Sequence, residues 1–219
     1  DDAVLNMMLG NHDFVRFGDL LQRADLAEPE DPEWWTRHEL AFMVQAAYSG
    51  SITFPDWLNV LERPLLRRGA GSSSFDSEGV ATRERRLVDG GVLTGYVLSS
   101  YSARRLGLQT TANAGGVRNL LLEPGGESCE TPLERLRDGL YVTELMGQGV
   151  NLVTGDYSRG AGGFLVRDGE LVLPVDGVTI AGNLADMFAG IVTAGSDIDT
   201  RGNLHCGSIL VDRMTVAGS

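Results

Sequence analysis

Apolar residues follow a helical period near the start of this chain. In FGDLLQRADL (residues 17–26) they recur at i, i+3, i+4 and i+7, which is the spacing of one helix face. A second helix is predicted over residues 33–48, because Pro32 suits a first helical position and Asp31 can cap it. Ser49-Gly50 then favours a helix end. Residues 1 to about 50 are therefore predicted to be helical.

The pattern changes from about residue 52, where short apolar runs alternate with glycine turns. Residues 83–98 predict two strands around Asp-Gly-Gly, and residues 162–175 repeat this form around Asp-Gly. Residues 183–195 predict a short amphipathic helix, and residues 205–218 a final strand or hairpin. The second segment is therefore predicted to be rich in antiparallel sheet.

These two patterns place a domain boundary between residues 51 and 52. Residues 1–51 are predicted to be a helical appendage and residues 52–219 a single α+β domain dominated by antiparallel sheet. The chain opens on Asp1-Asp2 without an initiator methionine. We therefore expect either that a leader was removed or that the chain begins within a fold.

Composition limits the classes of partner. The net charge is −12 and all 18 basic residues are arginine, which argues against nonspecific binding to nucleic-acid phosphates. No apolar run approaches the roughly 20 residues that span a bilayer, and no signal peptide is visible. The two cysteines, Cys129 and Cys206, lie far apart and predict free thiols in a cytoplasmic protein. Together with the charge and the short apolar runs, this predicts neither a membrane partner nor a nucleic-acid partner.

The stretch NLHCGSILV (residues 203–211) carries the strongest candidate chemistry, His205 next to Cys206. Adjacent strand residues point to opposite faces, so one metal could bind both only at a bulge. Three interpretations stay open: two packing residues, a Cys–His nucleophile, or a zinc site. In the zinc site Cys206 and His205 would be joined by His12 or His38.

Other motifs favour structure over chemistry. His38-Glu39 lacks the second histidine of an H-E-x-x-H helix. TGDYSRGAGG (residues 154–163) lacks the lysine of a phosphate-binding loop and is predicted to be a turn. RERR (residues 83–86) is predicted to be a solvated strand face, and residues 104–116 a structural connection.

Residues 52–219 resemble the C-terminal half of the TldD/PmbA family on its PmbA (TldE) side. The matching stretches are FPDWLNVLERP, SSSFDSEGVATRERRLVDGGVLTGYVLSSYSARRLGLQTTANAGG, GVNLVTGDYSRGAGGFLVRDGELVLPVDGVTIAGNLADMF and SDIDTRGNLHCGSILVDRMTVAG. The resemblance implies an α+β domain that pairs with a TldD-type zinc metallopeptidase. It also implies that residues 154–163 lie between sheets, where Tyr157, Ser158 and Arg159 could line a cleft. The zinc site of that partner resembles an HExxxH helix with a distant cysteine. Cys206-Gly207 matches the cysteine position, but this chain contains no HExxxH.

Residues 1–50 resemble the α-amylase family of glycoside hydrolases, in MMLGNHDFVRFGDLL and WWTRHELAFMVQAAYSGSIT. The resemblance implies that Asp13 stabilises a transition state and that His12 contacts a sugar. The nucleophile and acid carboxylates of that family are absent, and retaining hydrolysis needs two carboxyl groups. We therefore expect no amylase-type glycosidase activity, and we interpret the chain as a chimeric join of two fragments.

Two functions follow. In the first, the chain is a catalytically silent binding or assembly module of the PmbA type. It would form a homodimer or pair with a TldD-type partner, since Trp34, Trp35 and Phe42 predict uncovered apolar surface. In the alternative, zinc held around Cys206 hydrolyses small esters, amides or phosphoesters.

Overall fold

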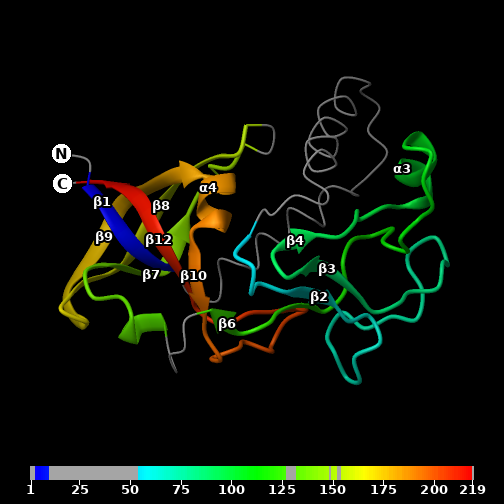
Figure 1. The fold of residues 1–219 in the computed structure, drawn as a ribbon, viewed down its shortest axis with the longest axis horizontal. Coiled ribbons are helices and arrows are strands. Elements are labelled where there is room, and N and C mark those ends of the chain that lie inside the picture. Colours follow the sequence, from blue (N-terminus) through cyan, green and yellow to red (C-terminus); the bar gives the residue numbers. More distant parts are fainter. Residues whose placement is uncertain (1–2, 10–53, 127–131, 148, 152–153, 219) are drawn as a thin grey trace.

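The computed structural model describes residues 3–9, 54–126, 132–147, 149–151 and 154–218, and within these ranges the chain is built mainly of β-strands (Figure 1). Two short α-helices and one 3-10 helix interrupt the strands. The elements in chain order are β1 (Ala3–Leu9), β2 (Val60–Glu62), β3 (Arg85–Asp89), β4 (Val92–Leu93), α3 (Ser100–Arg105), β5 (Leu120–Leu122), β6 (Gly125–Gly126), η1 (Pro132–Glu134), β7 (Gly139–Met146), β8 (Asp156–Arg167), β9 (Glu170–Asn183), α4 (Leu184–Ala189), β10 (Ile191–Ala194), β11 (Leu204–His205) and β12 (Ile209–Ala217).

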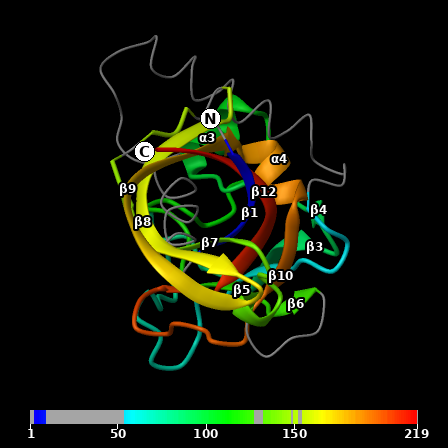
Figure 2. The same cartoon turned by 90° about the vertical axis from the view of Figure 1, so that its left-hand side faces the viewer.

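The larger sheet closes into a ring of five strands. Its order is β1-β7-β8-β9-β12, with β10 and β6 continuing beyond β12, and β12 also pairs with β1. Figure 2 looks along this ring. All pairs around the ring are antiparallel except β1–β7, which is parallel. Closure gives each of these strands a neighbour on both edges over at least part of its length, whereas an open sheet would leave two edge strands.

Strand β1 corrects the prediction that residues 1 to about 50 are helical. Ala3–Leu9 is a strand that pairs with β7 on one side and with β12 on the other. The apolar run of this segment suits a strand with neighbours on both edges. The two predicted helices over residues 17–26 and 33–48 lie outside the described residues.

A smaller sheet of five strands, in the order β11-β5-β2-β3-β4, lies beside the ring. One apolar cluster joins the two sheets. It includes Leu58, Val60 and Leu120 from the small-sheet side and Leu140, Ile180 and Met214 from ring strands. Because ring strands β7, β8, β9 and β12 all contribute to this cluster, it fills the inside of the ring.

Both predicted hairpins are present. Strands β3 and β4 flank Gly90 and Gly91, and β8 and β9 flank Asp168 and Gly169. Asp168 and Gly169 have φ angles of 51° and 83°, the left-handed values that a tight hairpin turn requires at both central residues. The turn predicted for residues 154–163 is wrong from residue 156 onward, where β8 begins. The glycines there let the backbones approach closely, since a Cβ on Gly163 would lie 1.9 Å from the Tyr141 carbonyl oxygen.

The hairpin of β8 and β9 leaves one sheet edge open. β12 pairs with β9 only at residues 179–181, so no described strand pairs with the outer edge of β9 over residues 170–177. Leu171, Val172 and Leu173 are 48%, 58% and 55% exposed on this edge. Among the described helices, none is long and apolar enough to cross a membrane.

Candidate functional site

His205 and Cys206 lie at the end of β11 and have different surroundings. Cys206 is 1% exposed and belongs to the central apolar cluster, and its Sγ donates to the Gly207 carbonyl at 3.0 Å. His205 is half-buried, with Nε2 3.1 Å from the Gly202 carbonyl oxygen. The thiol therefore packs in the core while the imidazole contacts a surface turn.

The described residues do not fit a zinc site. Within the ranges that the structure describes, no group of three or more His, Cys, Asp or Glu side chains could hold a metal ion. Zinc in proteins needs at least three such ligands around one point. His12 and His38, the other candidate ligands, lie outside the described residues. The set of Cys206, His205, His12 and His38 therefore stays a prediction.

The segment that follows Cys206 is held tightly against the loop after β10. Asp197 accepts hydrogen bonds from the Ser208 backbone N–H at 2.9 Å and from the Ser208 hydroxyl at 2.6 Å. A Cβ on Gly207 would lie 2.1 Å from the Gly195 carbonyl oxygen. This contact requires glycine after the cysteine and fixes the Cys206 backbone.

A buried ionic network in the smaller sheet overturns one expectation. Arg85, predicted to be solvated as part of RERR, donates from Nε to the Oε2 atom of Glu62 at 2.8 Å. Glu62 is 3% exposed, and its Oε1 accepts from Asn113 Nδ2 at 2.7 Å and from the Arg118 backbone N–H at 2.9 Å. The two other nitrogens of Arg85 donate to Asn113 and to the Tyr96 carbonyl. This network joins β2, β3 and the loop between α3 and β5, and we assign it a structural role.

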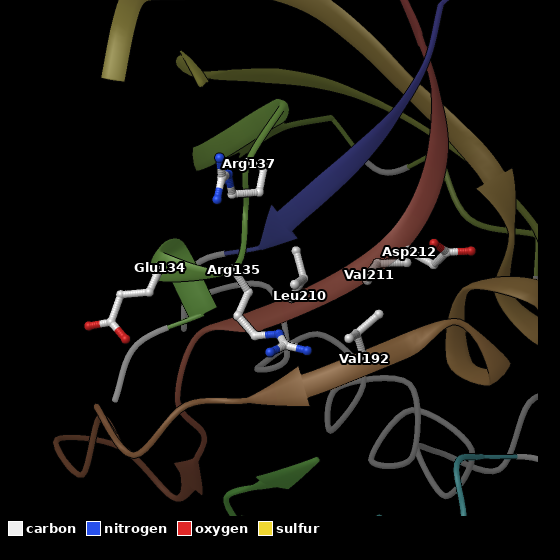
Figure 3. Close-up of a pocket in the computed structure, with 7 residues that line it drawn as sticks. All are labelled: Glu134, Arg135, Arg137, Val192, Leu210, Val211 and Asp212. Carbon is white, nitrogen blue, oxygen red and sulfur yellow. The ribbon is translucent and has the colours of Figure 1, made fainter. Parts of the chain in front are cut away.

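A surface pocket of about 410 Å³ lies between η1 and strands β10 and β12 (Figure 3). Its floor is apolar, and exposed charged side chains surround it. The lining residues are Glu134, Arg135, Arg137, Val192, Leu210, Val211 and Asp212. The lining includes two carboxylates and two guanidinium groups, so its charge favours neither anionic nor cationic ligands.

Arg159 has the most unusual environment of the described charged residues. It lies on β8 between Tyr157 and Ala161, and all three are buried, whereas Ser158 is exposed. Arg159 is 3% exposed, yet its Nε and Nη2 atoms have no hydrogen-bond partner. The family resemblance implied that Tyr157, Ser158 and Arg159 line a cleft. The alternation along β8 turns only Tyr157 and Arg159 inward. Buried charged groups are normally paired, so Arg159 is a candidate binding residue.

Known proteins are similar to this chain in sequence and in fold. The sequence profile described as "PmbA/TldA metallopeptidase C-terminal domain" matches residues 42–218. The chain is 53% identical to "Metalloprotease PmbA" of Escherichia coli O157:H7 over 169 residues, which is 77% of this chain and 38% of that protein. It is 47% identical to a "Metalloprotease PmbA homolog" of Haemophilus influenzae over 171 residues, 78% of this chain and 38% of the relative. The chain thus spans little more than a third of these relatives.

Solved structures agree with the fold. A putative modulator of DNA gyrase from Bacteroides thetaiotaomicron superposes with a TM-score of 0.85 at 25% identity, over 100% of this chain and 48% of that one. TldE from Thermococcus kodakarensis superposes with a TM-score of 0.77 at 20% identity, over 100% of this chain and 51% of that one. The second likeness concerns the fold alone.

Proposed function

The chain belongs to the PmbA/TldD metallopeptidase family, and we propose that it is a partner-binding C-terminal domain of the PmbA (TldE) type that does not itself hold the catalytic metal. The open edge of β9 carries this proposal. Glu170 to Gly177 have no described strand on their outer side, and three consecutive large apolar residues are exposed there. An exposed apolar strand edge is a ready template for pairing with another chain.

The surroundings of Cys206 support a domain that does not hold the catalytic metal. A cysteine that served as a ligand would need two further donors around its Sγ. Instead, Cys206 packs against apolar side chains of the core, and the thiol donates to the adjacent Gly207 carbonyl. A buried cysteine of this kind behaves as a small hydrophobic residue.

We expect a second copy of this chain to cover the β9 edge, giving a homodimer. Strand pairing between two such edges would bury Leu171, Val172 and Leu173 and satisfy backbone groups on both copies. A TldD-type protein is the other candidate partner for the same edge. The residues Trp34, Trp35 and Phe42, on which the dimer prediction also rested, lie outside the described residues.

Light scattering on the purified chain tests this role. The chain should form a dimer at micromolar concentration, and Val172→Glu combined with Leu173→Glu should give the 23.5 kDa monomer. Leu65→Glu is the matched control, because Leu65 is 56% exposed but lies in a loop of the smaller sheet. A wild-type chain that is monomeric and does not bind a purified TldD-type protein would contradict the proposal.

A metal-dependent hydrolase is the second candidate, because the curated relatives are named metalloproteases. Zinc held by Cys206 and histidines would lower the pKa of a bound water to about 7, which suits hydrolysis of small esters, amides or phosphoesters. Its third ligand would have to come from His12 or His38. Stoichiometric zinc in the purified chain that is lost in both Cys206→Ala and His205→Ala would favour this function over the assembly role.

The chimeric origin of the chain stays a proposal. The family profile begins at residue 42, and the likeness of residues 1–50 to the α-amylase family rests on the sequence stretches alone. Neither proposed function depends on that likeness.

A further inference from the structure

The environment of Arg159 points to a ligand. Its guanidinium carries a permanent charge, because arginine is not deprotonated in proteins. The residue is 3% exposed, and two of its nitrogens are both buried and without a hydrogen-bond partner. A buried ion without a counter-charge is strongly unfavourable unless another group binds it. The described residues place no carboxylate within ion-pair distance of this side chain.

The two orphaned atoms, Nε and Nη2, belong to one edge of the guanidinium. This edge presents two parallel N–H groups, which match the two oxygens of a carboxylate. The same chain shows the geometry at Arg201, whose Nε lies 2.9 Å from Oδ1 of Asp199 and whose Nη2 lies 2.6 Å from Oδ2. The corresponding edge of Arg159 is complementary to a carboxylate that the described residues do not provide.

The position of Arg159 in the ring makes this edge reachable. Arg159 pairs with Ile180, Ile180 pairs with Val216, and Val216 pairs with Ala3. This row lies near one end of the ring, where β8 and β1 begin and β9 and β12 end. Three described pairs lie farther out on β8 and β9, namely Ser158–Ala181, Tyr157–Gly182 and Asp156–Asn183. Of these, Tyr157–Gly182 alternates to the same face as Arg159, and the side chains of Met187 and Met214 lie over Gly182. A slender group enters by displacing the unbranched, flexible side chain of Met187.

The width of the ring selects the shape of the ligand. An eight-stranded barrel is just wide enough for its own side chains, so a five-stranded ring filled by residues such as Ala161, Ile180 and Met214 leaves less space. A flat carboxylate at the end of a chain fits such a space better than a tetrahedral phosphate. We propose that the Nε–Nη2 edge of Arg159 binds a carboxylate that enters the ring end, supplied by a peptide C-terminus or by an acidic side chain. This inference is independent of the assembly role.

Thermal unfolding of the full 219-residue chain with defined probes tests the proposal. A ligand that binds only the folded state raises Tm in a saturable manner. N-acetyl-Gly-Gly with a free carboxylate and the α-amide of N-acetyl-glutamate present the two sources of carboxylate separately. N-acetyl-Gly-Gly-amide and inorganic phosphate are the negative probes. We expect at least one carboxylate probe to raise Tm, and the tighter one identifies the source.

Two variants make the result specific. Arg159→Met keeps an unbranched apolar stem but removes the guanidinium and its charge. We expect it to weaken carboxylate binding roughly a hundredfold or more, because two charge-assisted hydrogen bonds are lost. Its Tm without probe should equal or exceed that of the wild type, since the variant removes an unpaired buried charge. Arg167→Met, on the exposed end of the same strand, is the matched control and should bind as the wild type does.

Several results would overturn the proposal. A wild-type chain whose Tm rises with neither carboxylate probe would do so. Equal shifts from the acid and the amide, or from phosphate and carboxylate, would show that no carboxylate is recognised. Retained binding in Arg159→Met would place the ligand elsewhere.

Discussion

Glu62 on β2 and Arg85 on β3 form an ion pair inside the smaller sheet, with Arg85 Nε 2.8 Å from Glu62 Oε2. Their side chains are 3% and 15% exposed, and Asn113 bridges them by bonding to both. The pair is therefore shielded from solvent and held by further hydrogen bonds, unlike the exposed pair of Arg63 and Glu84 at 3.7 Å.

Removing one partner of the buried pair should destabilise the fold. We expect Glu62→Ala to lower the free energy of unfolding by about 3–5 kcal/mol, because it leaves the Arg85 charge buried without a counter-charge. Glu84→Ala removes the exposed pair and should change stability by less than about 1 kcal/mol. Urea unfolding monitored by fluorescence measures both. Equal losses for the two variants would mean that the network does not act as a buried ion pair.

Gly207 should tolerate no side chain. A Cβ there would lie 2.1 Å from the Gly195 carbonyl oxygen, so Gly207→Ala forces two backbone segments apart and should cost about 3 kcal/mol. At Gly202 the nearest atom to an added Cβ is 3.9 Å away, and Gly202→Ala should change stability by less than about 0.5 kcal/mol. Thermal unfolding of both variants checks the difference, and a harmless Gly207→Ala would show that the loop after β10 can move.

Cys206 should behave as a packing residue. Cys206→Ala removes one buried heavy atom and should cost about 1 kcal/mol. It should leave the metal content of the purified chain unchanged, as measured by inductively coupled plasma mass spectrometry before and after treatment with a chelator. A zinc ion present in the wild type and lost in this variant would instead support the hydrolase.

The turn between β8 and β9 should depend on its backbone conformation. Asp168 has a φ angle of 51°, which is costly for a β-branched residue. We expect Asp168→Val to lower stability by about 1–2 kcal/mol, whereas Asp168→Asn should stay within about 0.5 kcal/mol because Asn-Gly suits the same turn. Chemical denaturation distinguishes them. Similar stabilities for the two variants would indicate that the turn adapts.

Local chemistry made part of this fold predictable. A Gly-Gly turn and an Asp-Gly turn specify the two hairpins through the backbone angles of two adjacent residues, so a short stretch of sequence is sufficient. Ring closure has no such local signal, since Leu9 pairs with Ile209 from the opposite end of the chain. The apolar segment at residues 3–9 therefore gave no indication of the partners that make it a strand.

The surroundings of the candidate site residues also depend on contacts between distant parts of the chain, which local sequence does not reveal. Alternation along a strand predicts that Cys206 and His205 face different ways, but it cannot tell which side chains surround either of them. Arg85 belongs to a charged run that favours a solvated face, and its partner Glu62 comes from another strand, 23 residues earlier. Arg159 lies in a glycine-rich stretch typical of a turn. Its burial depends on the closure of the ring, in which Arg159 pairs with Ile180 of β9.

The pairing of β1 with β12 affects how this protein is made. As the ribosome synthesises the chain, β1 emerges before the other four strands of the ring and β12 emerges after them, so β1 has only β7 to pair with until β12 has been made. Until then, the apolar interior of the ring faces water, and the unpaired edge of β1 is open to other nascent chains. Emergence of β12, rather than formation of an early hairpin, is therefore the step that protects this sheet from aggregation.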